Sequence, residues 1–292
     1  MNLAARRIWT FANWLKVVAL TVLYIALLSV NYSTITLSNA ATKTPIQLIL
    51  VAFIDTLLLS YFALRSRWKG WKEWGAVFVI LYGMVYVLTA AETFYLGSIL
   101  SASMALALLV NGAITSVIFA GALAWVFGGK GMQGGMSSTR LKMPGREWAW
   151  KIVVSAVVYL LLFFVFGFMV YMPLGKALDP VAYTQEQSIA SNASSLVFPI
   201  ELLRGALWAL FAVPAIIALS FGWKKTGVTI GLLMAIPLAL FQFLSTTTTI
   251  GLQIAHTAEI VGENMVFGFL LVWVLHVHSR LPTDGRPESN AP

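Results

Sequence analysis

This chain has no cysteine and little charge: none of its 292 residues is cysteine, and 10% are Asp, Glu, Lys or Arg. The absence of cysteine excludes disulfide bonds, thiolate metal sites and a cysteine nucleophile. An ordinary soluble domain has roughly a quarter of its residues charged, whereas 59% of this chain is hydrophobic. Because so much apolar surface cannot be hidden inside one aqueous globule, we predict an integral membrane protein with the lipid bilayer as its principal partner.

The apolar segments of the chain are long and show no strand-like alternation. Each has about 20 residues, the length that a helix needs to cross the hydrocarbon core, whereas a barrel strand would show about 10 alternating residues. Hydrocarbon offers no water to unpaired backbone groups, so the spans must be helices. We therefore predict an all-α polytopic membrane protein with eight transmembrane helices, at residues 14–31, 46–64, 75–91, 101–127, 152–172, 197–221, 228–244 and 256–277. Seven spans are the alternative, because only residues 245–249, all Ser or Thr, and a few further residues separate the last two spans.

The formal net charge of +8 is distributed unevenly over this predicted topology. With the amino terminus in the cytoplasm, sixteen of the nineteen Lys and Arg residues lie in or beside cytoplasmic segments, and the exceptions are Lys43, Lys176 and Arg204. The cytoplasmic side then carries a net charge of +12 and the other side −4. Because cytoplasmic loops collect Lys and Arg, we predict a multi-pass protein of the plasma (cytoplasmic) membrane with both termini in the cytoplasm. The predicted topology accounts for the excess of Lys and Arg over Asp and Glu, so we expect no nucleic-acid partner.

A Gly-rich segment at residues 128–147 divides the chain and predicts a flexible cytoplasmic linker. It separates two predicted four-helix membrane repeats, residues 1–127 and 148–280, and residues 281–292 are predicted to form a disordered cytoplasmic tail. Residues 173–195 are polar and predict a translocated loop. The halves resemble each other at matching places, which favours a parallel 4+4 duplication. The matching positions are Lys16 and Tyr24 with Lys151 and Tyr159, Pro45 with Pro199, and Trp68 with Trp223.

One acidic residue lies near the centre of the second predicted span. Asp55 is nine residues from either end of that span, hence near the membrane midplane. Ionisable groups inside a span are costly and mark either a site or a structural pair. The functional hypothesis is that Asp55 binds a proton or a cation. The structural alternative is a protonated or hydrogen-bonded packing residue beside Thr56 or Asn111.

A second set of ionisable residues gathers in the outer half of the membrane, mostly in the carboxy-terminal repeat. The set comprises Glu92 at the outer end of the third span, Glu201 and Arg204 in the sixth span, and His256, Glu259 and Glu263 in the eighth. His256 and Glu263 are seven residues apart and therefore share one helical face. Together these residues predict a polar pocket open to the outside. The alternative is a structural, interhelical salt bridge of Arg204 with Glu201 or Glu263, with His256 and Glu259 at the wet interface.

The same carboxylates and imidazole could bind a divalent metal whose bound water hydrolyses a substrate. No His-Glu-x-x-His motif and no nucleotide-binding loop is present, so no cofactor is evident. Membrane-embedded glutamate proteases combine Glu, Arg and His, but they have paired glutamates before the arginine. This chain has Pro199, Ile200 and a single Glu201 at that place, so the catalytic pair is absent and no family is assigned.

The function that best fits these residues is that of a transporter-like or ligand-binding membrane protein. Its ligand would be a small molecule or an ion that enters the polar pocket from the outer side. A membrane-embedded hydrolase that depends on a metal or on carboxylates is the alternative, and a non-catalytic subunit of a membrane complex is the third. The sequence is equally compatible with a homo-oligomer and a hetero-oligomer.

Overall fold

The computed structural model of this protein describes residues 9–35, 45–91, 102–128, 143–192, 194–244 and 248–276. Within these residues the regular structure is helical, as predicted, and eight helical stretches are long and apolar enough to cross a membrane. The protein is therefore a polytopic membrane protein. The alternative of seven spans is wrong, because separate helices precede and follow the Ser and Thr run at residues 245–249.

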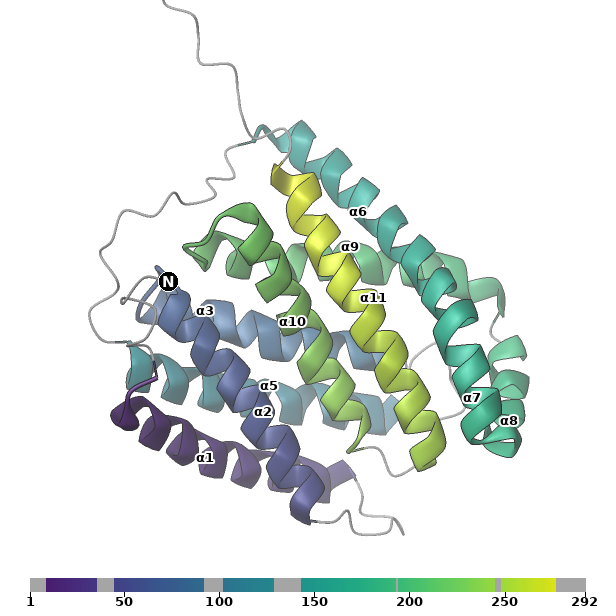
Figure 1. The fold of residues 1–292 in the computed structure, drawn as a ribbon, viewed down its shortest axis with the longest axis horizontal. Helices are drawn as coiled ribbons and strands as arrows, with labels where there is room; N and C mark the ends of the chain where they lie inside the picture. Colours follow the sequence, from purple (N-terminus) through teal and green to yellow (C-terminus); the bar gives the residue numbers. More distant parts are fainter. Residues whose placement is uncertain are drawn as a thin grey trace, which may run out of the picture.

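The helices follow one another without domain-sized insertions (Figure 1). In chain order they are α1 (Phe11–Ile35), α2 (Pro45–Arg65), α3 (Trp71–Phe78), the π-helix η2 (Val79–Val87), α5 (Ala102–Phe127), α6 (Gly145–Phe166), the π-helix η3 (Gly167–Tyr171), α7 (Met172–Leu178), α8 (Pro180–Asn192), α9 (Ser194–Ala218), α10 (Trp223–Gln242) and α11 (Ile250–His276). The third span combines α3 and η2, and the fifth combines α6, η3 and α7. The fifth span has 34 residues, so it must tilt or protrude from a core that about 20 residues can cross.

The prediction of a polar loop at residues 173–195 is wrong. This segment is mostly helical, because α7 continues the fifth span and α8 forms a separate polar helix. Asp179 starts α8 by accepting a hydrogen bond from the backbone N–H of Ala182 at 3.0 Å, and Pro180 fits the first helical turn. Local capping therefore determines where α8 starts, which the length of apolar segments does not predict.

The two halves of the chain use the same helix pairings. In the first half α1 packs against α2 and α5, and α3 packs against α5; in the second half α6 packs against α9 and α11, and α10 against α11. The halves meet where α10 contacts α2 and η2 and where α9 contacts α3 and η2. The duplication itself stays a prediction. Most of the predicted linker and all of the predicted tail lie outside the described residues, and α6 already begins at Gly145.

Two lysines, the half-buried Lys69 and the buried Lys151, lie at the end of the molecule where α2, α5, α9 and α11 terminate. Lys69 pairs with Glu73 at 3.2 Å and donates to the carbonyl oxygens of Ala63 and Phe127, near the last turns of α2 and α5. Lys151 donates to the carbonyl oxygen of Leu275 at 3.1 Å. Each lysine therefore satisfies carbonyl groups that a helix end leaves open, at the negative end of the helix dipole.

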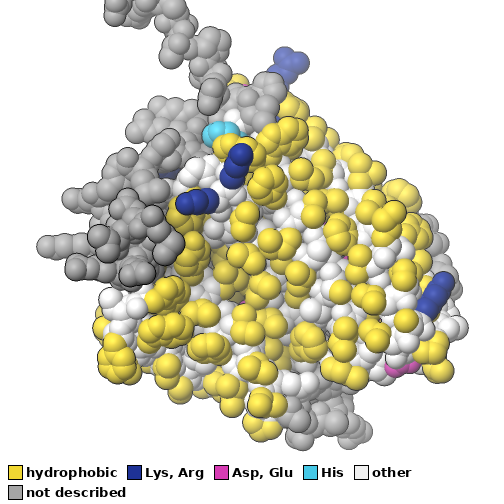
Figure 2. All heavy atoms as spheres, viewed as in Figure 1, with side chains coloured by type: hydrophobic (Ala, Val, Ile, Leu, Met, Phe, Trp, Pro, Cys, Tyr) yellow, Lys and Arg dark blue, Asp and Glu magenta, His cyan; other side chains and the backbone are white. Residues whose placement is uncertain are grey.

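The connection between α2 and α3 pairs with the connection between α9 and α10 at the same end. The backbone N–H of Arg67 donates to Ala218 at 2.8 Å, beside an isolated bridge between Ser66 and Leu219. In Figure 2 hydrophobic side chains cover most of the visible face, and most of its Lys and Arg lie along one margin. We call this end of the molecule the basic end.

Helices α10 and α11 approach each other most closely at two glycines. A Cβ added to Gly268 would lie 2.5 Å from the Cα of Gly231. Such backbone contact is typical of small residues at helix crossings in membranes, where packing rather than a hydrophobic drive holds helices together.

We expect Gly268→Ala to destabilise the fold by about 1–3 kcal/mol, because the added methyl group must push two backbones apart. The measurement is the free energy of unfolding of the purified protein in detergent. Gly75→Ala is the matched control, since nothing lies within 4 Å of a Cβ at Gly75. Equal stability of the two variants would contradict the close crossing.

Candidate functional site

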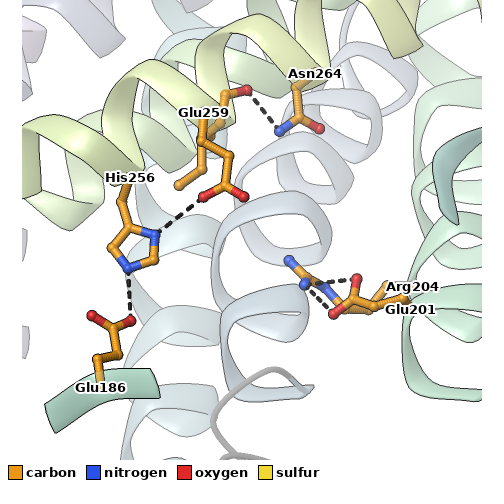
Figure 3. A network of polar contacts seen from close by, with 7 residues as sticks. Glu186, Glu201, Arg204, His256, Glu259 and Asn264 are labelled. Atoms are coloured by element: carbon orange, nitrogen blue, oxygen red, sulfur yellow. Dashed lines mark hydrogen bonds and ion pairs between the residues drawn. The ribbon is translucent and has the colours of Figure 1, made fainter. Parts of the chain in front are cut away.

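Five of the predicted site residues lie on α9 and α11, where Glu263 is within electrostatic range of Glu201, Arg204 and Glu259. Figure 3 shows four of them, Glu201, Arg204, His256 and Glu259, with the unpredicted Glu186 of α8. We call this set the polar cluster; its members are Glu186, Glu201, Arg204, His256, Glu259 and Glu263. All of them lie in the parts of α8, α9 and α11 that are remote from the basic end. Glu92 lies outside the described residues, and Asp55 belongs to α2 in the other half.

His256 lies between two carboxylates. Its Nε2 is 2.9 Å from Oε1 of Glu186 on α8, and its Nδ1 is 3.3 Å from Oε2 of Glu259 on the next turn of α11. The ring of Tyr171 stacks on the imidazole, with centroids 4.3 Å apart. Because only the protonated ring has two N–H donors, the positively charged form alone can donate to both carboxylates at once.

Glu186 brings a charge to this site from outside the membrane spans. Burial raises the pKa of Glu186, but the hydrogen bond and the positive charge of His256 outweigh burial and hold that pKa below its ordinary value of 4.5. The helix that carries Glu186 is tied to the start of α11 as well. The backbone N–H of Ala182 and the hydroxyl of Thr249 donate to Asp179 and hold the pKa of this carboxyl below its usual 3.8.

Glu201 and Arg204 form an ion pair within one turn of α9. Nη1 of Arg204 donates to both carboxylate oxygens of Glu201, at 2.8 and 2.9 Å, and both side chains are buried. The guanidinium also lies 5.9 Å from the ring centre of Tyr159 on α6. The predicted pairing of Arg204 with Glu201 is therefore confirmed, and it lies within one helix rather than between two.

Glu263 is an acid of the cluster that takes part in no ion pair with another described residue. It is 4% exposed and lies within electrostatic range of Arg204, Glu259 and Glu201. Its carboxyl accepts a hydrogen bond from Tyr159, while Oε1 has no partner among the described residues. Four carboxylates thus share one guanidinium and one imidazole, so the cluster has fewer positive charges than acids.

The π-helix η3 shapes the wall of the cluster opposite α11. A Cβ at Gly167, the first residue of η3, would lie 3.5 Å from Oε1 of Glu259, so the backbone itself approaches this carboxylate. Tyr171, the last residue of η3, stacks on His256. A π-helical turn changes the direction of the side chains that follow it and is frequent at functional sites.

No group of three or more His, Asp or Glu side chains within the described residues is arranged to hold a metal ion. In comparisons with known proteins, no family model, curated protein or solved structure matches this chain. The geometry of the polar cluster is therefore the basis for interpreting it.

Glu186, Tyr171 and Tyr159 are site residues that the sequence alone did not indicate. Glu186 lies in the polar segment 173–195, for which the low hydrophobicity predicts a loop. Asp179 followed by Pro180 is nevertheless a helix-start signal, and it is compatible with α8. The tyrosines carry no such signal, since their positions depend on how α6 and η3 pack against α11.

We expect Glu186→Gln to lower the free energy of unfolding by about 1 kcal/mol near pH 6, because it replaces a charge-assisted hydrogen bond by a neutral one. The lowered pKa means that ionised Glu186 stabilises the fold above pH 4.5 and that this contribution is lost as pH falls through the folded-state pKa. Unfolding in detergent between pH 3 and about 6 measures the difference. Gln185→Ala, an exposed change on the same helix, is the control. A difference that persists at the lowest pH would contradict the role of this ion pair.

Proposed function

We propose that this protein is a transporter-like membrane protein of the plasma membrane that binds a cationic ligand, an organic cation or a proton, in the polar cluster. The observation that carries the proposal is the position of Glu263, a buried carboxyl among three other carboxylates with a single arginine and a single histidine.

The charge of the cluster favours a positive ligand. Arg204 is already bound by Glu201, and His256 by Glu186 and Glu259. An ionised carboxylate that is buried without compensation costs several kcal/mol, so it takes up a proton or a cation. Glu263 is the carboxyl group that would take up this proton or cation.

The basic end supports a cytoplasmic orientation for the loops that it contains. Lys69 and Lys151 lie there among the ends of α2, α5 and α11, and cytoplasmic loops are the ones that collect Lys and Arg. The polar cluster then faces the outer side, with α8 between it and the external water. This placement suits a ligand that arrives from outside.

The hydrolase alternative has less support from the geometry. A general base needs a free nitrogen or oxygen within reach of the substrate. Both ring nitrogens of His256 are engaged by Glu186 and Glu259, so the imidazole has no nitrogen to offer in this conformation. A non-catalytic subunit of a complex is the outcome if the cluster binds nothing.

The orientation can be tested directly because the chain has no native cysteine. We expect a single cysteine from Gln185→Cys on α8 to react in intact cells with a membrane-impermeant maleimide. A cysteine from Lys72→Cys at the basic end should react only after the membrane is opened. The opposite pattern would reverse the proposed topology.

We expect Glu263→Gln to weaken cation binding roughly tenfold or more, since it removes the charge that the ligand would balance. The probes are tetramethylammonium and methylguanidinium chloride, each compared with potassium chloride at equal ionic strength, and the readout is the unfolding temperature of the purified protein. Proteoliposomes with an internal pH dye then show whether a gradient of the same cations moves protons.

Asp179→Asn is the matched control, because it removes an outer carboxylate outside the cluster while Asn still caps α8. If the cations stabilise both Glu263→Gln and Asp179→Asn, the cations bind outside the polar cluster. If neither the wild type nor the control responds to the cations or to pH, the cluster is structural and the proposal fails.

A further inference from the structure

Asp55 occupies the centre of a membrane helix, far from any helix end. Ten residues separate it from either end of α2, and its side chain is 3% exposed. α2 packs against α1, α5 and α10, so Asp55 faces the interior of the helix bundle rather than lipid. This places a carboxyl group near the midplane in the half that does not contain the polar cluster.

No counter-charge accompanies this carboxyl group in the described part of the chain. Oδ1 of Asp55 has no hydrogen-bond partner there, and no ion pair there includes this side chain. A charged carboxylate in such a position is among the most costly groups that a membrane protein can carry. A positive charge that is bound to Asp55 would remove this cost.

A linked pair of tyrosines includes one that lies within electrostatic range of Asp55. Tyr24 of α1 is within electrostatic range of Asp55, and its hydroxyl is hydrogen-bonded to that of Tyr86. Tyr86 lies in the π-helix η2, and its ring is held against Gly112 and Phe241. Tyr24 thus connects the region of Asp55 with Tyr86 of η2, whose π-helical form is frequent at functional sites.

Neighbouring hydroxyl groups on α2 also lack their usual partners. Thr21 and Ser155 donate to the carbonyl oxygen four residues before them, as hydroxyls in membrane helices commonly do. Thr56 and Ser60 are fully buried, yet their oxygens have no partner among the described residues. Buried polar atoms without partners point to a bound water or ion.

We propose that Asp55, Tyr24 and Tyr86 form a second site, beyond the polar cluster, that binds a single monovalent cation, either a sodium ion or a proton. One carboxylate balances one positive charge, and carboxylate and hydroxyl oxygens are hard donors that suit such a cation. α10 lies between α2 and α11 and contacts both, so this site is separate from the polar cluster (Figure 1). A cation there would link α1, α2 and η2.

The test uses the purified full-length protein in detergent and records the unfolding temperature. Sodium chloride is titrated against potassium chloride at constant ionic strength and constant pH, and a second series varies pH without sodium. We expect a rise in unfolding temperature with sodium if the ligand is sodium, or with falling pH alone if the ligand is a proton. Either dependence should be lost in Asp55→Asn, whose amide keeps the shape and removes the charge.

Tyr24→Phe is the second variant and keeps the test decisive if Asp55→Asn does not fold. Removing one hydroxyl ligand should shift the midpoint of the sodium or proton dependence by roughly tenfold, since a hydrogen bond to a charged group is lost. Ser155→Ala removes a buried hydroxyl in the other half and should leave the midpoint unchanged.

Glu263→Gln separates this site from the polar cluster. The Asp55-dependent response should persist in that variant, even if cation binding at the cluster is lost. A wild-type protein that responds to neither sodium nor pH overturns the proposal. So does a response that survives in Asp55→Asn and Tyr24→Phe, or one that disappears only in Glu263→Gln.

Discussion

The cost of burying charge in a low-dielectric environment determines how the ionisable groups of this protein are arranged. A charge that enters the bilayer needs a partner, because water cannot solvate it there. Arg204 meets this requirement with Glu201 one turn away, and His256 meets it with Glu186 and Glu259. The acids outnumber the bases even so. That imbalance is the physical reason for regarding the polar cluster as a site for a positive ligand rather than as a closed structural network.

A helix outside the membrane spans completes the cluster. Asp179 caps α8 and fixes where it starts, and about two turns later Glu186 reaches the imidazole of His256. A local capping interaction therefore positions a charge that acts in the tertiary structure. Since α8 is polar and lies at the end opposite Lys69 and Lys151, it also connects the cluster with the water on that side.

The two π-helical segments have corresponding roles in the two halves. η2 contains Tyr86, which is hydrogen-bonded to Tyr24, and Tyr24 lies within electrostatic range of Asp55. η3 contains Tyr171, which stacks on His256. An added residue in a helical turn costs regular hydrogen bonding, so its presence in both halves is consistent with a functional constraint there. The proposed sites thus share a construction although they use different acids.

Composition and apolar length determined the class of this protein and its eight spans, because the thickness of the bilayer sets how long an apolar helix must be. Helical periodicity also put His256, Glu259 and Glu263 on one side of a helix, since the angle between residues is fixed locally. The partners of these residues depended on tertiary structure. Glu186 and Tyr171 reach His256 only because α8 and η3 pack on α11, and such contacts between distant segments have no periodic signal in the sequence.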